Sequence, residues 1–256
     1  MNTSKYDPVD QEFPPAYDEP QASRSPGDNV PDDFKYSVAV ASCELPVRQI
    51  FIRRVYSLLS LQIMGTVIVG MILHSNSSIR NWCLNNMWLL LVTGIASFGF
   101  LIATHFKARS YPTNLILLSA FTLCEAYAVG VVCSVVETDV LVQALLLTMV
   151  VFIGLTMFAF QTKYDFISWQ GFASMALWFL IGWGILFMIF PGYSKSMDLV
   201  YSGVGALLFC LYILIDTQRI MKTAYLDDEI ISTIALYLDI LNLFLYILRI
   251  MQRRDS

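Results

Sequence analysis

The sequence predicts an all-α polytopic membrane protein in which six hydrophobic helices surround a central, polar seventh helix, preceded by a disordered tail. Of its 256 residues, 57% are hydrophobic and only 14% are charged, which is more apolar than an ordinary soluble domain. Apolar runs long enough to cross a hydrocarbon core of about 30 Å recur seven times after residue 54. The connections between these runs are short, so no soluble domain is expected between spans.

Residues 1–45 are expected to form a disordered cytosolic tail, and residues 46–256 the seven-helix membrane domain. Seven of the nine prolines lie in the first 46 residues, among scattered acidic and serine residues, and such a composition cannot bury a core. The tail contains Pro14, Pro15 and Tyr17 in a PPxY sequence, whose polyproline II geometry suits the aromatic grooves of WW domains. This motif predicts recruitment of a cytosolic WW-domain ubiquitin ligase. The alternative is a chance match in a proline-rich segment.

The apolar runs are separated by residues typical of turns. Asn76-Ser77-Ser78 follows the first run, Tyr111-Pro112 precedes the third, and Pro191-Gly192-Tyr193 follows the fifth. Each run is long enough for one membrane-spanning helix. In chain order the predicted spans are Val55–Leu73, Met87–Thr104, Thr113–Cys133, Val140–Phe160, Ile167–Phe190, Leu199–Ile215 and Ile230–Leu248.

The distribution of basic residues predicts a cytosolic N-terminus, because Lys and Arg near spans favour the cytosolic side. One set of span ends carries eight of them: Arg48, Arg53, Arg54, Lys107, Arg109, Lys163, Arg219 and Lys222. The opposite connections carry only Arg80 and Lys195. However, Arg249, Arg253 and Arg254 follow the seventh run and conflict with the rule if that run crosses the membrane completely. A segment that enters and returns would remove the conflict, so the location of the C-terminus stays open.

Three acidic residues lie within or at the end of apolar runs. Asp239 is near the middle of the seventh run, Asp216 ends the sixth, and Glu125 lies inside the third. A charged side chain at bilayer depth costs roughly 2.5 to 3.5 kcal/mol on insertion scales and often marks an ion or proton path. Glu125 is therefore a candidate pore or proton-binding group, unless it is a neutral acid satisfied by a backbone kink. The alternative for Asp216 is an interfacial ion pair with Arg219.

The seventh run has one polar face, to which Asp239, Asn242 and Tyr246 belong. If the last two spans pack side by side, Asp216 and Asp239 meet, and two close carboxylates cannot both ionise at low cost. Such a pair shares a proton and senses pH. Carboxylate oxygens also suit hard cations, which makes the pair a candidate calcium site. The alternative is a buried hydrogen-bond seam that only specifies helix packing.

Lys107 and Arg109 follow the second span, where a basic side chain is a candidate latch for the acid pair. The alternative for both is ordinary snorkelling at the membrane edge. No cofactor and no nucleic-acid partner is expected from the composition.

Several long segments resemble the transmembrane BAX inhibitor motif family, most closely its lifeguard and Golgi anti-apoptotic protein branch. The segments that carry the resemblance are, in order, PVRQIFIRRVYSLLSLQIMGT, YPTNLILLSAFTLCEAYAVG, LTMFAFQTKYDFISWQG, GALLFCLYILIDTQRIM and ALYLDILNLFLYILRIM. They cover about residues 32 to 252, so the proline-rich, acidic first 30 residues lie outside the shared pattern.

The resemblance implies six helices around a seventh, a calcium leak from an internal store and suppression of cell death. It also implies that Asp216 and Asp239 are the pair that titrates and gates the leak, and that a basic residue after the second span, best matched by Arg109, latches them. The sequence is therefore interpreted as a pH-sensitive calcium leak channel of the Golgi, endoplasmic reticulum or vacuole.

Other functions for the same residues stay open. A proton-coupled calcium exchanger would use the same acids, and a non-transporting scaffold would act through the tail. An intramembrane aspartyl protease also uses two aspartates on adjacent helices, but the GxGD signature of that class is absent from the sequence. The protein is therefore not expected to be an enzyme.

Overall fold

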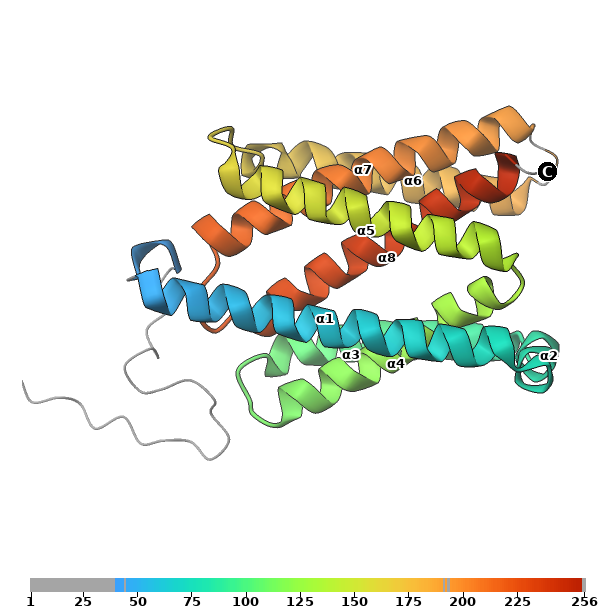
Figure 1. Ribbon diagram of the computed structural model, residues 1–256, viewed down its shortest axis with the longest axis horizontal. Coiled ribbons are helices and arrows are strands. Elements are labelled where there is room, and N and C mark those ends of the chain that lie inside the picture. Colours follow the sequence, from blue (N-terminus) through green and yellow to red (C-terminus); the bar gives the residue numbers. More distant parts are fainter. Residues whose placement is uncertain (1–39, 44, 191, 193, 255–256) are drawn as a thin grey trace, which may run out of the picture.

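The computed structural model describes residues 40–43, 45–190, 192 and 194–254. Within these residues seven helices are long and apolar enough to cross a membrane, which confirms the predicted spans of an integral membrane protein. They are α1 (Leu45–Ser75), α3 (Trp88–Lys107), α4 (Thr113–Ser134), α5 (Thr138–Gln161), α6 (Gln170–Ile189), α7 (Lys195–Lys222) and α8 (Glu229–Arg254) (Figure 1). The PPxY motif lies outside the described residues.

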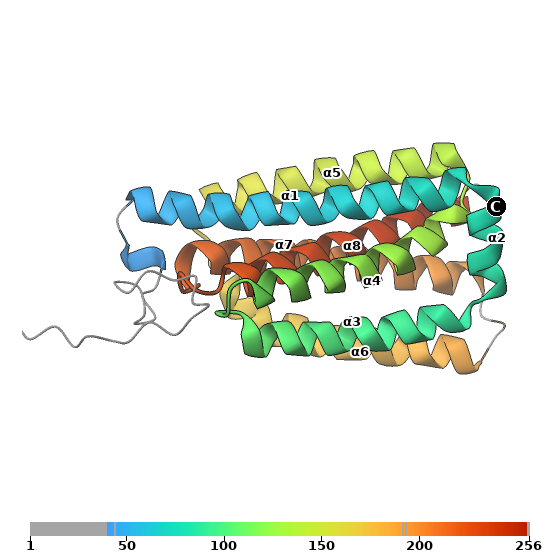
Figure 2. The same cartoon turned by 90° about the horizontal axis from the view of Figure 1, so that it is seen from below.

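The helices run alternately up and down the long axis of the bundle. We call one end of the bundle the near end. It contains Leu45, the first residue of α1, and the 223–228 connection between α7 and α8, and it lies on the left of Figure 1. At the far end α1 and α8 finish, as the left and right sides of Figure 1 show. Figure 2 shows three layers, with α1 and α5 on one side, α3 and α6 on the other, and α4, α7 and α8 between them.

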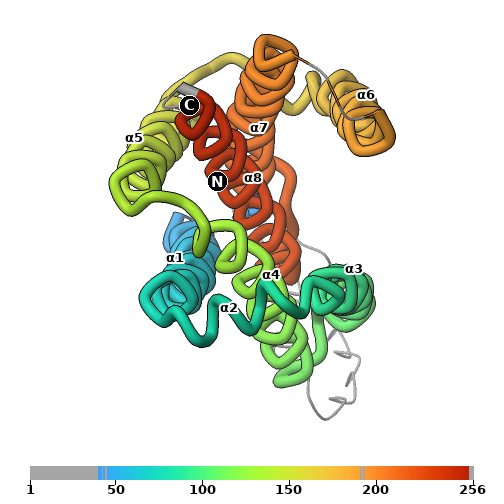
Figure 3. Tube along the Cα trace, turned by 90° about the vertical axis from the view of Figure 1, so that its right-hand side faces the viewer, coloured from blue at the N-terminus to red at the C-terminus, as the bar shows by residue number. Residues whose placement is uncertain are grey.

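Helix α8 is the central helix, as the sequence predicted. Within its most apolar window 61% of the residues are buried by protein, compared with 11% for α3 and for α6. It packs against α1, α4, α5 and α7, which surround it in the end-on view of Figure 3. It also runs without interruption from the near end to the far end. The seventh segment therefore crosses the whole bundle and does not enter and return.

Close packing and buried hydrogen bonds join α1 to α4 and α8. A Cβ atom at Gly130 in α4 would lie 2.6 Å from Leu73 Cδ1 and 3.5 Å from the Cα atom of Gly70, so α1 and α4 pack closely here and a larger residue would displace the Leu73 side chain. Gln62 Nε2 in α1 donates to Thr122 Oγ1 in α4 over 2.7 Å. The hydroxyls of Thr66 in α1 and Tyr237 in α8 are 2.8 Å apart. These polar contacts fix the relative position of three helices that are otherwise joined by apolar packing.

Helix α7 is fastened at the near end by the buried Gln218. Its Oε1 accepts a hydrogen bond from the backbone N–H of Phe166 over 2.8 Å, and its Nε2 donates to the carbonyl of Tyr164, also over 2.8 Å. Both partners lie between α5 and the short 3-10 helix η3 (Ile167–Trp169) that precedes α6. Gln218 thereby positions the part of α7 that carries Asp216.

Most of the helices are longer than the predicted runs; α7, for example, continues to Lys222 and not only to Ile215. Helix α1 begins at Leu45 and not at Val55, so its first turns contain polar residues that precede the apolar run. The turn predicted after the first span instead starts a short helix, α2 (Ser77–Asn85). The Asn76 side chain accepts hydrogen bonds from the N–H groups of Ser78 and Ile79 at 3.0 and 3.2 Å. Asn76 therefore acts as a helix N-cap.

Candidate functional site

Two buried carboxyl groups, those of Asp216 in α7 and Asp239 in α8, lie together within the bundle. The short 223–228 connection makes α7 and α8 antiparallel, and at about 1.5 Å per residue these positions lie roughly 9 and 15 Å from the connected helix ends. Only 9% of Asp216 and 5% of Asp239 is exposed. Both residues line a cavity of about 400 Å³ between α6, α7 and α8, here called the middle cavity. The two side chains thus border the same cavity from neighbouring helices.

The surroundings of the two carboxyl groups are unequal. Asp216 Oδ1 accepts a hydrogen bond of 3.4 Å from Arg219 Nη1, one helical turn away. Asp239 Oδ2 is buried and has no hydrogen-bond partner among the described residues. Burying an unpaired charge is costly, and two close carboxylates repel each other. The geometry therefore suits a pair that holds one proton in common.

Asp216 also faces a second cavity. This near-end cavity has a volume of about 420 Å³, and its lining includes His105 from α3, Asp216 and Arg219 from α7, and Ser232 from α8. Asp216 thus lies at the boundary between the near-end and middle cavities. The basic group beside the acid pair is Arg219, so the ion pair considered for Asp216 from the sequence is present.

The polar face of α8 continues beyond the acid pair. Asn242 and Tyr246 line the middle cavity and also the far-end cavity, which has a volume of about 640 Å³ and includes Arg249 and Arg253 in its lining. Asn242 Nδ2 donates to the carbonyl of its own helix at Leu238 over 2.8 Å. Within the described part of the chain, three cavities thus follow one another along a single face of α8.

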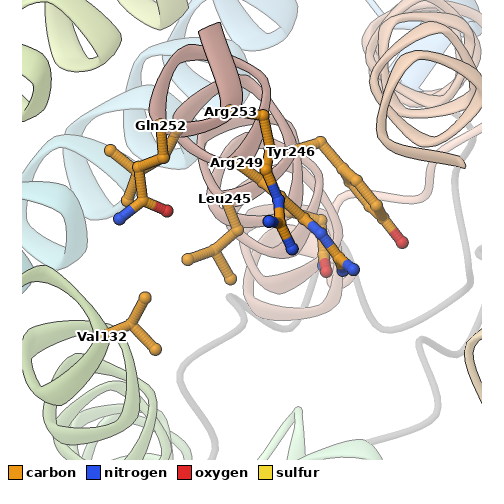
Figure 4. A pocket seen from close by; sticks show the side chains of 8 residues that line it. Val132, Leu245, Tyr246, Arg249, Gln252 and Arg253 are labelled. Carbon is orange, nitrogen blue, oxygen red and sulfur yellow. The ribbon is translucent and has the colours of Figure 1, made fainter. Parts of the chain in front are cut away.

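The far end carries a cluster of charges whose partnership the sequence did not reveal. Asp198, in the first turn of α7, is only 1% exposed and binds two arginines of α8. Arg253 Nε lies 2.7 Å from Asp198 Oδ2, and Arg249 Nη2 binds Asp198 Oδ1. Figure 4 shows Arg249 and Arg253 beside Tyr246 at the far-end cavity. The sequence did contain one signal for this cluster, because Arg249 and Arg253 lie on the side of the membrane that the positive-inside rule disfavours. Arginines in such a position are expected to pair with an acidic residue.

Arg109, one of the two latch candidates, does not contact the acid pair in this structure. It forms an ion pair with Asp227, whose side chain is 8% exposed and which lies in the connection between α7 and α8. Lys107, the other latch candidate, is the last residue of α3 and also lies at the near end of the bundle. Arg109 is therefore linked to the acid pair through the segment that joins the two acid-bearing helices.

Glu125 lies apart from the acid pair. It is half-buried in α4 and accepts a hydrogen bond from the hydroxyl of Ser97 in α3. It does not contribute to the described lining of the middle cavity. The structure thus places Glu125 between α3 and α4, and its role in a pore or in proton binding stays a prediction.

The acid pair provides few ligands for a resident metal ion. Calcium usually takes six to eight oxygen ligands. Among the described residues no group of three or more His, Cys, Asp and Glu side chains is placed to hold a metal. Calcium binding at Asp216 and Asp239 stays a prediction.

The sequence match to known proteins covers the whole helical bundle. The family model described as "Inhibitor of apoptosis-promoting Bax1" matches residues 48–256, which include the acid pair and the far-end charges. The chain belongs to the Bax inhibitor family. The match begins after the proline-rich tail, as the resemblance in the sequence had indicated.

Relatives within the Bax inhibitor family are similar along nearly their full length. The chain is 36% identical to protein lifeguard 4 of Mus musculus, over 89% of this chain and 94% of the relative. It is 35% identical to Bax inhibitor 1 of Schizosaccharomyces pombe, over 93% and 89% respectively. The Golgi anti-apoptotic protein of vaccinia virus (strain Lister) is 33% identical, over 88% and 94%.

Proposed function

We propose that this member of the Bax inhibitor family is a pH-sensitive calcium leak channel of an internal membrane, gated by Asp216 and Asp239. The main support is the position of the buried acid pair at the boundary between two cavities that share Asp216. A cation following the polar face of α8 would meet these two carboxyl groups. An acid pair in a purely structural seam would not need to face two cavities.

The proposed gate depends on the number of protons that the pair holds. With one shared proton the carboxyl groups attract each other and hold α7 against α8. When that proton is lost, two like charges face each other in a poorly hydrated site, which favours their separation and the entry of a divalent cation. The other charged or titratable groups that line the two cavities are Tyr201, Tyr212 and Arg219 in α7, Tyr246 in α8, His105 in α3, and Tyr225 and Asp228 in the connection before α8.

Arg109 is proposed to restrain the gate indirectly. Its ion pair with Asp227 ties the end of α3 to the 223–228 connection, and both acid-bearing helices start or finish there. Arg109→Gln is expected to widen the pH range over which calcium leaks. Lys107→Gln, which removes a neighbouring charge, provides the matched control. A flux profile of Arg109→Gln equal to that of the natural protein would remove the latch role from Arg109.

The names of the relatives support a place in cell-death control. One viral relative is named a Golgi anti-apoptotic protein, and others are named Bax inhibitors. We infer that this chain suppresses cell death from an internal membrane, by lowering the calcium content of the store in which it resides. We also propose that the N-terminus is cytosolic. Basic residues that the sequence assigns to the cytosolic side, including Lys107 and Arg219, lie at the near end of the bundle, where α1 begins.

The direct test is calcium flux from liposomes that contain the purified protein, followed across a pH series. Asparagine resembles a protonated, neutral aspartate. The variant with both Asp216→Asn and Asp239→Asn is therefore expected to show, at every pH, the rate that the natural protein shows at the acidic end. A pH profile unchanged by both substitutions would refute the proposed gate.

Two other functions make different predictions in the same liposomes. A proton-coupled exchanger would need an opposing proton gradient, whereas a leak would not. A non-transporting scaffold would show no flux and would act through its tail, for which Tyr17→Ala is expected to abolish WW-domain binding. WW-domain binding that survives Tyr17→Ala would exclude the PPxY motif as the docking site.

A further inference from the structure

The far-end charges lie where the proposed cation path would leave the bundle. Arg249 lines the far-end cavity and also a cavity of about 410 Å³ between α6, α7 and α8. Its guanidinium carbon is 5.1 Å from the centre of the Tyr201 ring. The hydroxyl of Tyr246 donates in turn to that of Tyr201 over 3.3 Å, and both tyrosines line the middle cavity. Arg249 thus places a positive charge next to the exit of the middle cavity.

Asp198 positions that positive charge. It is almost completely buried, and its two oxygens bind different arginines, Arg249 and Arg253, whose side chains remain 36% and 43% exposed. Asp198 is fixed by its place in the first turn of α7, where Ser194 Oγ accepts a hydrogen bond from the N–H of Met197. The start of a helix also favours a negative side chain. The carboxylate is therefore a rigid anchor, and the guanidinium groups are the movable partners.

We propose that Asp198, Arg249 and Arg253 form a charge clamp, a second closure at the opposite end of the path from the acid pair. In the clamped state, the guanidinium group of Arg249 repels a cation that arrives from the middle cavity. Release of Arg249 from Asp198 would let the guanidinium swing toward the exposed end and open the exit. This inference rests on the proposed function, because it assigns to these residues control over the same cation path.

The clamp and the acid pair are expected to affect calcium flux differently. Arg249→Gln removes the positive charge from the exit and leaves Asp216 and Asp239 intact. It should raise calcium flux on the order of tenfold, since a unit charge within a few ångströms of a divalent cation is worth at least that factor. The pH midpoint should stay unchanged. Arg80→Gln, which neutralises an arginine at the same end but outside the clamp, should have no such effect.

Arg249→Lys separates charge from geometry. Lysine keeps the positive charge but cannot bind in the planar, forked manner of arginine, so its flux should lie between that of the natural protein and Arg249→Gln. Flux through Arg249→Gln that equals that of the natural protein, with an unchanged melting temperature, would overturn the proposal. A large shift of the pH midpoint in Arg249→Gln would also overturn it, because the far-end charges would then act on the acid pair.

A second measurement does not require calcium flux. Leu245 lines the far-end cavity, and a Leu245→Cys thiol is expected to react faster with a membrane-impermeant reagent when Arg249→Gln opens the exit. The protein without Leu245→Cys reports the background from native cysteines. If no variant conducts calcium but the thiol reacts faster, the proposed calcium leak fails and the clamp stands. If calcium is conducted and neither flux nor thiol reaction responds to Arg249→Gln, the clamp fails alone.

Discussion

Gly205 in α7 allows the close approach of α8 at the middle cavity. A Cβ atom at this position would lie 2.5 Å from two atoms of the Tyr246 ring, far inside ordinary contact distance. The ring cannot easily swing aside, because it stacks on Phe209 at a centroid distance of 5.8 Å and its hydroxyl contacts Tyr201. Gly205→Ala is therefore expected to force α7 and α8 apart or to displace Tyr246.

The magnitude follows from comparison with a neighbouring glycine. Overpacking a well-packed site costs typically about 1 to 3 kcal/mol. At Gly203, on the same helix, an added Cβ would meet no atom within 4 Å, and replacing a helical glycine by alanine favours the helix by up to about 1 kcal/mol. The gain in helix propensity is common to both variants and cancels, so Gly205→Ala should be less stable than Gly203→Ala by roughly 1 to 3 kcal/mol, the overpacking cost alone.

Reversible unfolding in mixed micelles, followed by helical circular dichroism, measures this difference. The pair of variants controls for helix propensity, because both replace glycine by alanine in α7. The calcium flux of Gly205→Ala should also change, since Tyr246 lines the middle and far-end cavities. Equal unfolding free energies for the two variants would refute the argument that Gly205 sets the spacing of α7 and α8.

Three further substitutions test how the helices are held. Gln218→Leu should lower the unfolding free energy by about 1 to 3 kcal/mol, since two hydrogen bonds to the connection before α6 are lost; an unchanged value would show that they add nothing. Tyr237→Phe, which removes the hydroxyl bonded to Thr66, should cost only about 0.6 to 1.7 kcal/mol, and a much larger loss in the same micelle titration would contradict this. Asp198→Asn should cost about 1 kcal/mol, less than a fully buried ion pair, because the two arginines that lose their partner are 36% and 43% exposed and can be hydrated; adding Arg249→Gln should restore part of it, and no recovery would show that the loss has another cause.

The spans could be predicted from the sequence because hydrophobic length is a local property. The meeting of Asp216 and Asp239 was also predictable, since a short connection between two long helices forces them to lie side by side. The central position of α8 followed from Asp239 itself, because a carboxyl group in an apolar run must be shielded from lipid.

The far-end charges could not be paired from the sequence alone. Asp198 is separated from Arg249 and Arg253 by 51 and 55 residues, and the match depends on how α7 and α8 are rotated about their axes. The partner of Arg109 was hidden for a similar reason. Several acids lie near the 223–228 connection, and only the folded chain shows that Asp227 is the one that Arg109 contacts.

Competition between calcium and protons tests the central proposal most directly. If calcium enters by contact with Asp216 and Asp239, it must displace the proton that they share. A tenfold rise in calcium should then lower the pH midpoint of the flux by up to about one unit, which corresponds to one proton released per ion bound. Liposome flux measured over a grid of pH and calcium concentration gives this shift. A midpoint that does not move with calcium concentration would contradict a gate at which the two ions compete.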